Sequence, residues 1–341
     1  MGGATQAPTP DVAALAAAVA EGNRRALARA ITLVESSRAD HRDEADHLLD
    51  ALMPRTGGAV RVGISGAPGV GKSTFIEALG NHVIGRGHRI AVLAVDPSSA
   101  LSGGSILGDK TRMERLSQRL EAFIRPSPAG RTLGGVTRHT RETIVLVEAA
   151  GFDVVLVETV GVGQSETAVA AMTDLFLLLL LPGAGDELQG IKRGIVELAD
   201  LIIVNKADGE LSAAAGRAAA DYRNALHLLR ARSAHWQVPV ETVSALEERG
   251  IDRVWELVTE YRRVRVASGE FQANRADQAR TWLRSEVAEN LLGLLDADPT
   301  LATRLRELDA AVAAGQVLPR VAADELTHRL RQQLAAAGTH R

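Results

Sequence analysis

Seven short, mostly apolar runs constrain the fold of this chain more than any other feature. They lie between residue 60 and residue 244, and most are separated by segments with helical spacing: VRVGIS, RIAVLAV, EAFIR, DVVLVE, LFLLLLL, LIIVN and VPVETVS. Strands buried on both faces have this apolar character, and helices between successive strands favour parallel pairing. The sequence therefore predicts an α/β fold, with a doubly wound, mostly parallel sheet covered by helices.

Helical patterns that carry no chemical motif flank this region. One extends from about residue 11 to residue 52, and the other from about residue 269 onward. We therefore expect three parts: an N-terminal helical extension at residues 1–57, a central α/β domain at residues 58–266 and a C-terminal helical arm at residues 267–341.

The composition argues against several classes of function. Lys and Arg total 39 against 42 Asp and Glu, and aromatic residues make up 3%, so the chain offers neither a basic surface nor stacking platforms for nucleic acid. Cysteine is absent, which excludes disulfides and fits a reducing compartment. The apolar run at residues 175–181 is far shorter than the roughly 20 residues of a membrane-spanning helix. We expect a soluble, cytoplasmic protein.

The sequence GAPGVGKST at residues 66–74 matches the phosphate-binding pattern G-x-x-x-x-G-K-[ST]. It follows a strand-like run and opens a helix-like one, as the pattern requires. Glycines let backbone N–H groups converge on phosphates, and the helix N-terminus adds partial positive charge. A glycine turn in an ordinary strand–helix unit is the alternative. We expect Lys72 to reach the β and γ phosphates and Ser73 to bind Mg²⁺, within a site formed by Gly66, Ala67, Pro68, Gly69, Val70, Gly71, Lys72, Ser73 and Thr74.

Three acidic residues are candidates for the same magnesium ion. Asp96 and Glu158 each end an apolar run, and Asp109 lies in a glycine-rich loop. Mg²⁺ takes one or two carboxylates together with phosphates and water, and ligands of doubly wound sheets collect at the carboxyl ends of strands. Each acid could instead cap a helix or lie solvated in a loop, and Glu158 could orient the attacking water.

The run LIIV is followed by Asn205-Lys-Ala-Asp208, the N-K-x-D signature of GTPases. A carboxylate at the fourth position can accept from guanine N1–H and the 2-amino group, whereas adenine offers no such pair, so Asp208 selects guanine. We expect the stem of Lys206 to lie along the base and Asn205 to tie the loop to the phosphate loop. A turn with a helix N-cap is the alternative. A later tripeptide resembles the element whose backbone N–H meets guanine O6: Ser244, Ala245 and Leu246.

The motifs and their order closely resemble the G-protein chaperones of adenosylcobalamin-dependent acyl-CoA mutases, typified by the methylmalonyl-CoA mutase-associated GTPase. The resemblance rests on GAPGVGKST (66–74), AVDPSS (94–99), SGGSILGDKTRM (102–113), RPSPAGRTLGGVTRHTRE (125–142), VETVGVGQSE (157–166), LPGAGDELQGIKRGI (181–195) and NKAD (205–208). It implies a SIMIBI-class P-loop GTPase that forms a homodimer partly through its C-terminal helices. It also implies that the GTPase gates delivery of adenosylcobalamin to the mutase and expulsion of damaged cofactor, with the cobalamin adenosyltransferase as a further partner.

The resemblance also assigns roles to individual residues. Asp96, Asp109 and Glu158 correspond to magnesium and switch carboxylates, and residues 183–192 correspond to an additional switch segment. In the family, an aspartate and a lysine of that segment couple mutase binding to faster hydrolysis, which makes Asp186 and Lys192 candidates for partner-stimulated catalysis. Without the resemblance, Lys192 would be interpreted as a solvated lysine on the following helix, because lysine is common on helix surfaces.

Two other functions share part of this pattern. A metallocentre-assembly GTPase would have the same sheet and base motif, but it needs a transferable-metal site, and the nine histidines here are scattered. An ATP-using kinase would share the phosphate loop, but Asp208 favours guanine. Because Gln164 stands further along than in a D-x-x-G-Q pattern, we predict slow hydrolysis in isolation and acceleration by a partner. The sequence does not identify which mutase is served.

Overall fold

The computed structural model describes residues 10–36, 38–95, 113–126, 133–159, 165–183, 193–227 and 232–338. Contacts divide the chain into two compact units, Met1–Asn274 and Arg275–Arg341. The three-part division expected from the sequence, with boundaries after residues 57 and 266, stays a prediction.

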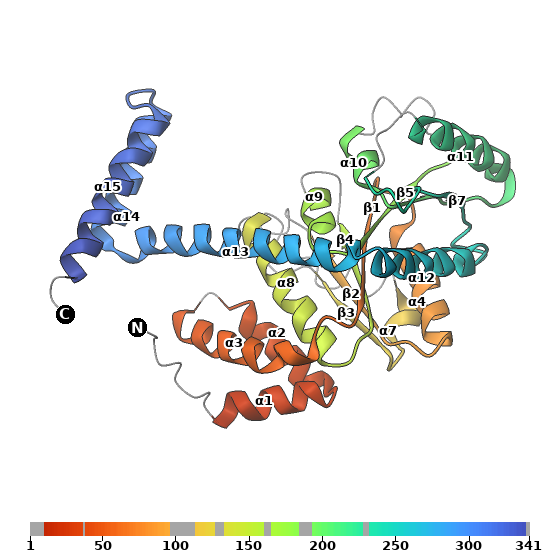
Figure 1. Cartoon of the computed structure of the whole chain (residues 1–341), viewed down its shortest axis with the longest axis horizontal. Coiled ribbons are helices and arrows are strands. Elements are labelled where there is room, and N and C mark those ends of the chain that lie inside the picture. The colour runs from red at the N-terminus through yellow and green to blue at the C-terminus, as the bar shows by residue number, and fades with distance from the viewer. Residues whose placement is uncertain are drawn as a thin grey trace. The chain divides into compact units, whose positions relative to one another are not determined.

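The first unit is built around a parallel sheet (Figure 1). In the part of the chain that the structure describes, seven strands are arranged in the order β3-β2-β4-β1-β5-β6-β7, and each neighbouring pair is parallel. This confirms the predicted doubly wound sheet. Each predicted apolar run supplies one strand: β1 (Val60–Gly66), β2 (Ile90–Val95), β3 (Ala122–Arg125), β4 (Val154–Thr159), β5 (Leu175–Leu180), β6 (Leu201–Val204) and β7 (Val240–Thr242).

Alternating side chains along the strands give the sheet two apolar faces. On one face, residues such as Val62 and Ile64 of β1 pack against three helices. These helices are α4 (Lys72–Gly85), α7 (Glu114–Ser117) and α12 (Ile251–Ala267). The phosphate loop therefore joins a buried strand to a buried helix, which holds both of its ends in place.

The opposite face is covered by helices from three regions of the chain. Residues such as Val157 of β4 pack against α8 (Leu133–Ala149) and α9 (Ser165–Ala170). Towards the β7 edge, α10 (Arg193–Leu198) and α11 (Ser212–Leu226) cover β5, β6 and β7. Burial on both faces explains why these strands are apolar throughout.

The N-terminal helices extend the second apolar face. They are α1 (Pro10–Ala20), α2 (Arg24–Val34) and α3 (Ala39–Leu52), followed by a short 3₁₀ helix, η1 (Met53–Arg55). Asn23 caps α2, because its side chain accepts hydrogen bonds from two backbone N–H groups of the first turn. The three helices contact α8 and share its apolar core (Figure 1).

The second unit is helical, and its boundary falls within α13 (Glu270–Ala297). It continues with α14 (Pro299–Ala313) and α15 (Pro319–Gly338). Arg304 of α14 forms an ion pair of 2.8 Å with Glu325 of α15. The two helices share a small apolar core formed by Leu308, Ala322 and Leu326. Among the described residues, no helix combines the length and the apolar character needed to cross a membrane.

One face of α13 carries a row of exposed apolar side chains. The row consists of Leu283, Val287, Leu291 and Leu294, each with at least 44% of its surface exposed. Spacings of four, four and three residues place these side chains along one face of a helix. A row of this kind is unusual on a surface that faces only water.

Candidate functional site

The loop between β1 and α4 is built around glycines that cannot readily be replaced. β1 ends at Gly66 and α4 begins at Lys72, so the predicted phosphate motif joins the strand to the helix. Gly69 and Gly71 have φ angles of 79° and 91°, in the left-handed region that favours glycine. A Cβ atom on Gly66 would lie 2.5 Å from the carbonyl oxygen of Leu179. Conformation and close approach therefore both demand glycine here.

Lys72 lies partly buried at the start of α4. Its ammonium group donates to the carbonyl oxygen of Gly66 at 2.7 Å. Burial lowers the pKa of Lys72, while the carboxylates of Glu158 and Glu166 act in the opposite direction by attraction. The loop thus holds a cation beside a helix N-terminus, an arrangement that suits phosphate oxygens.

Two buried carboxylates accompany this lysine. Glu158 is the penultimate residue of β4 and pairs in register with Ile64 of β1. Glu166 lies in the first turn of α9, and both glutamates are almost fully buried. Sequence reasoning assigned no role to Glu166, although this residue closes the run VETVGVGQSE. Its influence on Lys72 depends on how α9 packs, which no local pattern reveals.

The residues at this edge fit a magnesium ion bound together with a nucleotide. The Ser73 hydroxyl in the first turn of α4 and the Glu158 carboxylate near the end of β4 offer hard oxygen atoms of the kind that Mg²⁺ prefers. Mg²⁺ of this kind takes its other ligands from phosphates and water, so few protein groups are needed. Within the described ranges, no group of three or more His, Cys, Asp or Glu forms a metal cluster. Four predicted residues lie outside those ranges: Asp96, Asp109, Asp186 and Lys192.

One buried side chain joins the predicted base-binding loops to the phosphate loop. Asn205 Nδ2 donates to the carbonyl oxygen of Val70 at 2.8 Å, and Asn205 Oδ1 accepts from the N–H of Ala245 at 3.2 Å. A Cβ atom on Gly71 would lie 2.8 Å from Asn205 Nδ2, so glycine at this position makes room for the link. Ala245 belongs to the tripeptide that resembles the guanine O6 element, and its own N–H donates to Asn205 in this structure.

Asp208 lies directly before η3 (Gly209–Leu211), at the end of the N-K-A-D loop. Its Oδ2 accepts a hydrogen bond of 2.5 Å from the buried hydroxyl of Ser244. Leu246, at the tip of the following turn, is 77% exposed. The fold therefore brings the three predicted nucleotide-binding motifs together at the carboxyl edge of the sheet.

Arg249 also belongs to this edge, although no motif marks it. Its guanidinium donates to the carbonyl oxygen of Ala207, the residue before Asp208. Sequence reasoning missed this contact because it joins positions that lie 42 residues apart.

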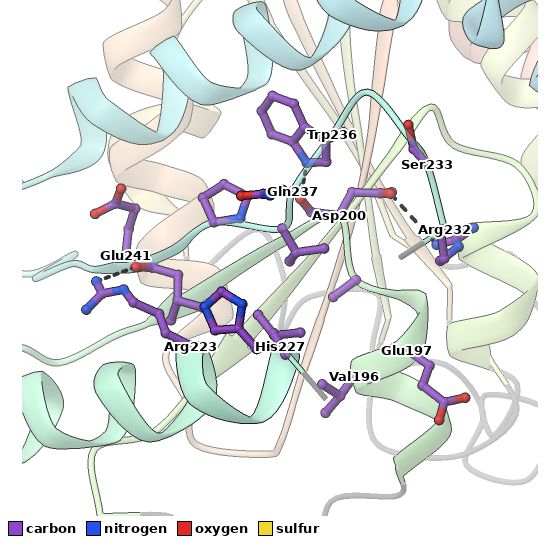
Figure 2. Close-up of a pocket in the computed structure, with 15 residues that line it drawn as sticks. Val196, Glu197, Asp200, Arg223, His227, Arg232, Ser233, Trp236, Gln237 and Glu241 are labelled. Carbon is purple, nitrogen blue, oxygen red and sulfur yellow. Dashed lines mark hydrogen bonds and ion pairs between the residues drawn. The ribbon is translucent and has the colours of Figure 1, made fainter. Parts of the chain in front are cut away.

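A separate cavity of about 450 Å³ lies at the opposite, amino-terminal edge of β6 and β7 (Figure 2). Arg223 and His227 line it from the end of α11, and Asp200 and Arg232 lie across from them. Burial raises the pKa of Asp200, and the charge of Arg232 partly offsets this effect. The cavity has charges of both signs, and none of the predicted site residues that the structure describes lines it. We therefore place the candidate site at the carboxyl edge.

Comparison with known proteins agrees with this architecture. Residues 27–300 match the family model described as methylmalonyl Co-A mutase-associated GTPase MeaB. A probable GTPase of Mycobacterium tuberculosis is 56% identical over 312 residues, which cover 92% of this chain and 93% of the relative. GTPase ArgK of Escherichia coli is 47% identical over 313 residues, covering 92% of this chain and 95% of the relative.

A mammalian relative and a solved structure extend the comparison. The mitochondrial methylmalonic aciduria type A homolog of Mus musculus is 49% identical over 316 residues, covering 90% of this chain and 76% of the relative. A crystal structure described as LAO/AO transport system kinase is 40% identical, covers 94% of this chain and 97% of its own, and has a TM-score of 0.72.

The parallel sheet and its strand–loop–helix unit define a P-loop nucleotide hydrolase of the SIMIBI class. The chain belongs to the MeaB family of methylmalonyl-CoA mutase-associated GTPases, and it is a GTPase.

The Gly71→Ala substitution tests the predicted role of the phosphate loop. Alanine at a φ of 91° is strained, and its Cβ would crowd Asn205, so we expect stability to fall by about 1–3 kcal/mol. We also expect GDP binding to weaken at least about tenfold, a loss of roughly 1.4 kcal/mol. Denaturant unfolding and calorimetric titration measure the two effects.

Gly85→Ala is the matched control, because a Cβ there, at the end of α4, meets nothing within 4 Å. This control should bind GDP like the wild type. Equal stability and equal GDP binding in the two variants would contradict the steric account of the loop.

Proposed function

We propose that this protein is a GTP-hydrolysing chaperone that gates adenosylcobalamin loading and protects or reactivates a B12-dependent acyl-CoA mutase. Methylmalonyl-CoA mutase is the first candidate, because the matching family model is named for association with that enzyme. The observation that carries the proposal is the link through Asn205, which ties a phosphate loop to a guanine-type base loop in a chain of this family.

We infer that the β and γ phosphates of GTP lie in the loop at residues 66–74, with Lys72 neutralising their charge. Ser73 would hold a magnesium ion together with carboxylates drawn from Asp96, Asp109 and Glu158. Such an ion supplies charge neutralisation to the phosphate oxygens. The support is the burial of Glu158 and the opposing influence of its carboxylate on the pKa of Lys72. If the phosphates bind beside Lys72, a cation between them and the Glu158 carboxylate would offset the repulsion between these negative groups.

Guanine recognition rests on the carboxylate of Asp208. The hydrogen bond from Ser244 occupies one position on Oδ2, so the carboxylate retains lone pairs for guanine N1–H and the 2-amino group. Lys206 would lie along the base, and the turn at Ser244, Ala245 and Leu246 would close over it.

The compartment we propose is the cytoplasm.

Partner-stimulated hydrolysis is proposed for the segment at residues 183–192. Asp186 and Lys192 would act only when the mutase binds, with Lys192 moving toward charge that develops on the transferred phosphoryl group. The support is the motif LPGAGDELQGIKRGI in a chain of this family. The cobalamin adenosyltransferase is a further proposed partner, because it would supply the cofactor.

We also propose a homodimer held through the C-terminal arm. The exposed row on α13, at Leu283, Val287, Leu291 and Leu294, supports this proposal. A second copy would remove these side chains from water, which stabilises association in proportion to the apolar area buried.

The Asp208→Ala substitution tests base selection. Removing two hydrogen bonds to a charged acceptor should weaken GTP binding by about 100-fold or more, since each is worth roughly 1.5–3 kcal/mol. ATP binding should not change, so the preference for GTP should disappear in parallel calorimetric titrations. Glu210→Ala is the control, because Glu210 is an exposed carboxylate only two residues away. If the wild-type protein binds ATP at least as tightly as GTP, the result would favour an ATP-using kinase.

Single-turnover GTP hydrolysis tests the proposed dependence on a partner. We expect slow hydrolysis by the isolated protein and faster hydrolysis with the cognate mutase. Lys192→Ala should leave the isolated rate and GTP affinity unchanged but reduce the stimulated rate by about 100-fold or more, because transition-state charge stabilisation would be lost. Lys192→Arg, which keeps the charge, should retain part of the stimulation. Fast hydrolysis without any partner would rule out a partner-timed switch.

Sedimentation velocity tests the dimer. Leu291→Glu places a charge in the middle of the α13 row and should shift the protein from dimer to monomer. Val321→Glu is the control, because Val321 is 55% exposed but lies on α15. The proposal fails if Leu291→Glu remains a dimer at the concentration where the wild type is one.

A further inference from the structure

We propose that Arg249 is a positioning residue for base selection, holding the N-K-A-D loop so that the Asp208 carboxylate stays directed at guanine. This inference rests on the proposed role of Asp208 in binding the base. Arg249 itself would not touch the nucleotide. It would act through the peptide that precedes Asp208, because its guanidinium donates to the carbonyl oxygen of Ala207.

The backbone of Arg249 is fixed by a closed turn. The N–H of Ser244 donates to the carbonyl of Arg249 at 3.1 Å, and the N–H of Arg249 donates to the carbonyl of Ser244 at 3.0 Å. Ser244 is fully buried, and Gly250, with a φ of 80°, leads directly into α12. Arg249 therefore stands at the base of the turn that carries Ala245 and Leu246, with little freedom in its main chain.

The side chain of Arg249 completes a clamp on the neighbouring loop. Ala207 is buried, and its N–H donates to the carbonyl of Val243 at 3.0 Å. Its carbonyl accepts from Arg249. Both peptide groups of Ala207 are therefore bonded to the segment that follows β7, and the second of them leads directly to Asp208.

The loop needs such a clamp because its backbone is strained. Lys206 has a φ of 58°, a left-handed conformation that residues other than glycine seldom adopt. Strain of this kind persists only where neighbouring contacts over-determine the backbone. Without Arg249, the buried Ala207 carbonyl would lose its donor, and rotating the peptide toward water would also turn Asp208 away from Ser244.

The other contact of Arg249 does not explain its position. Its guanidinium lies 3.4 Å from Glu247, but the two side chains are 59% and 48% exposed. Ion pairs this exposed are weak and screened by salt. A substitution at residue 249 should therefore act mainly by removing the hydrogen bond to the buried carbonyl of Ala207.

Calorimetric titration of the full chain with GDP, ADP and inorganic tripolyphosphate tests the proposal. Arg249→Ala should bind GDP about tenfold more weakly than the wild type, equivalent to roughly 1.4 kcal/mol. Its affinity for tripolyphosphate should stay within about twofold, because the phosphate loop does not depend on Arg249, and its preference for GDP over ADP should fall. Arg249→Lys keeps a positively charged donor, so its GDP affinity should lie between those of the wild type and Arg249→Ala.

Glu247→Ala is the matched control, because it removes the exposed partner of Arg249 and leaves the bond to Ala207. It should bind GDP like the wild type. Unchanged GDP affinity in Arg249→Ala would overturn the proposal, and so would equal losses for GDP and tripolyphosphate, which would indicate general disruption. If Arg249→Ala does not fold, Arg249→Lys decides by the same comparison of GDP with tripolyphosphate. A wild-type protein that does not prefer GDP over ADP would instead refute the proposed function.

Discussion

The buried amide of Asn205 is the contact on which the arrangement of this site depends. Its two polar atoms bond to Val70 in the phosphate loop and to Ala245 in the turn after β7, so three loops from distant parts of the chain are held by one side chain. Both partners are backbone groups, and they are buried. Replacing the amide would leave an N–H and a carbonyl without partners in a place that water does not readily reach. The amide therefore specifies the distance between the place proposed for the phosphates and the place proposed for the base.

The sheet sets the conditions for this contact. β1, β5 and β6 are neighbours, and all three end at the same edge because they are parallel. Their apolar side chains are buried on both faces, so the strands cannot shift without exposing part of the core. The loops that follow them are therefore anchored on a rigid base. Glycine at position 71 then allows the close approach that a side chain would prevent.

Much of this could be predicted from the sequence, because the signals are local. The apolar runs predicted the seven strands that the structure describes, and the phosphate and base motifs predicted the loops that the structure brings together at the carboxyl edge. The contacts that the sequence did not predict join residues that are far apart in the chain. Glu166 acts on Lys72 only through the packing of α9, and Arg249 reaches Ala207 across a turn that has no recognisable pattern. The cavity at the amino-terminal edge is likewise lined from α10, α11 and the segment before β7, and none of the residues that line it belongs to a motif.

Hydrogen exchange measured by mass spectrometry, with and without GDP and Mg²⁺, tests directly whether guanine nucleotide bridges these loops. The account predicts that GDP slows exchange in residues 66–74, 205–208 and 244–249 together, and leaves the amino-terminal edge at residues 197–200 and 232–239 unchanged. Protection confined to the phosphate loop, or protection at the amino-terminal edge instead, would contradict it.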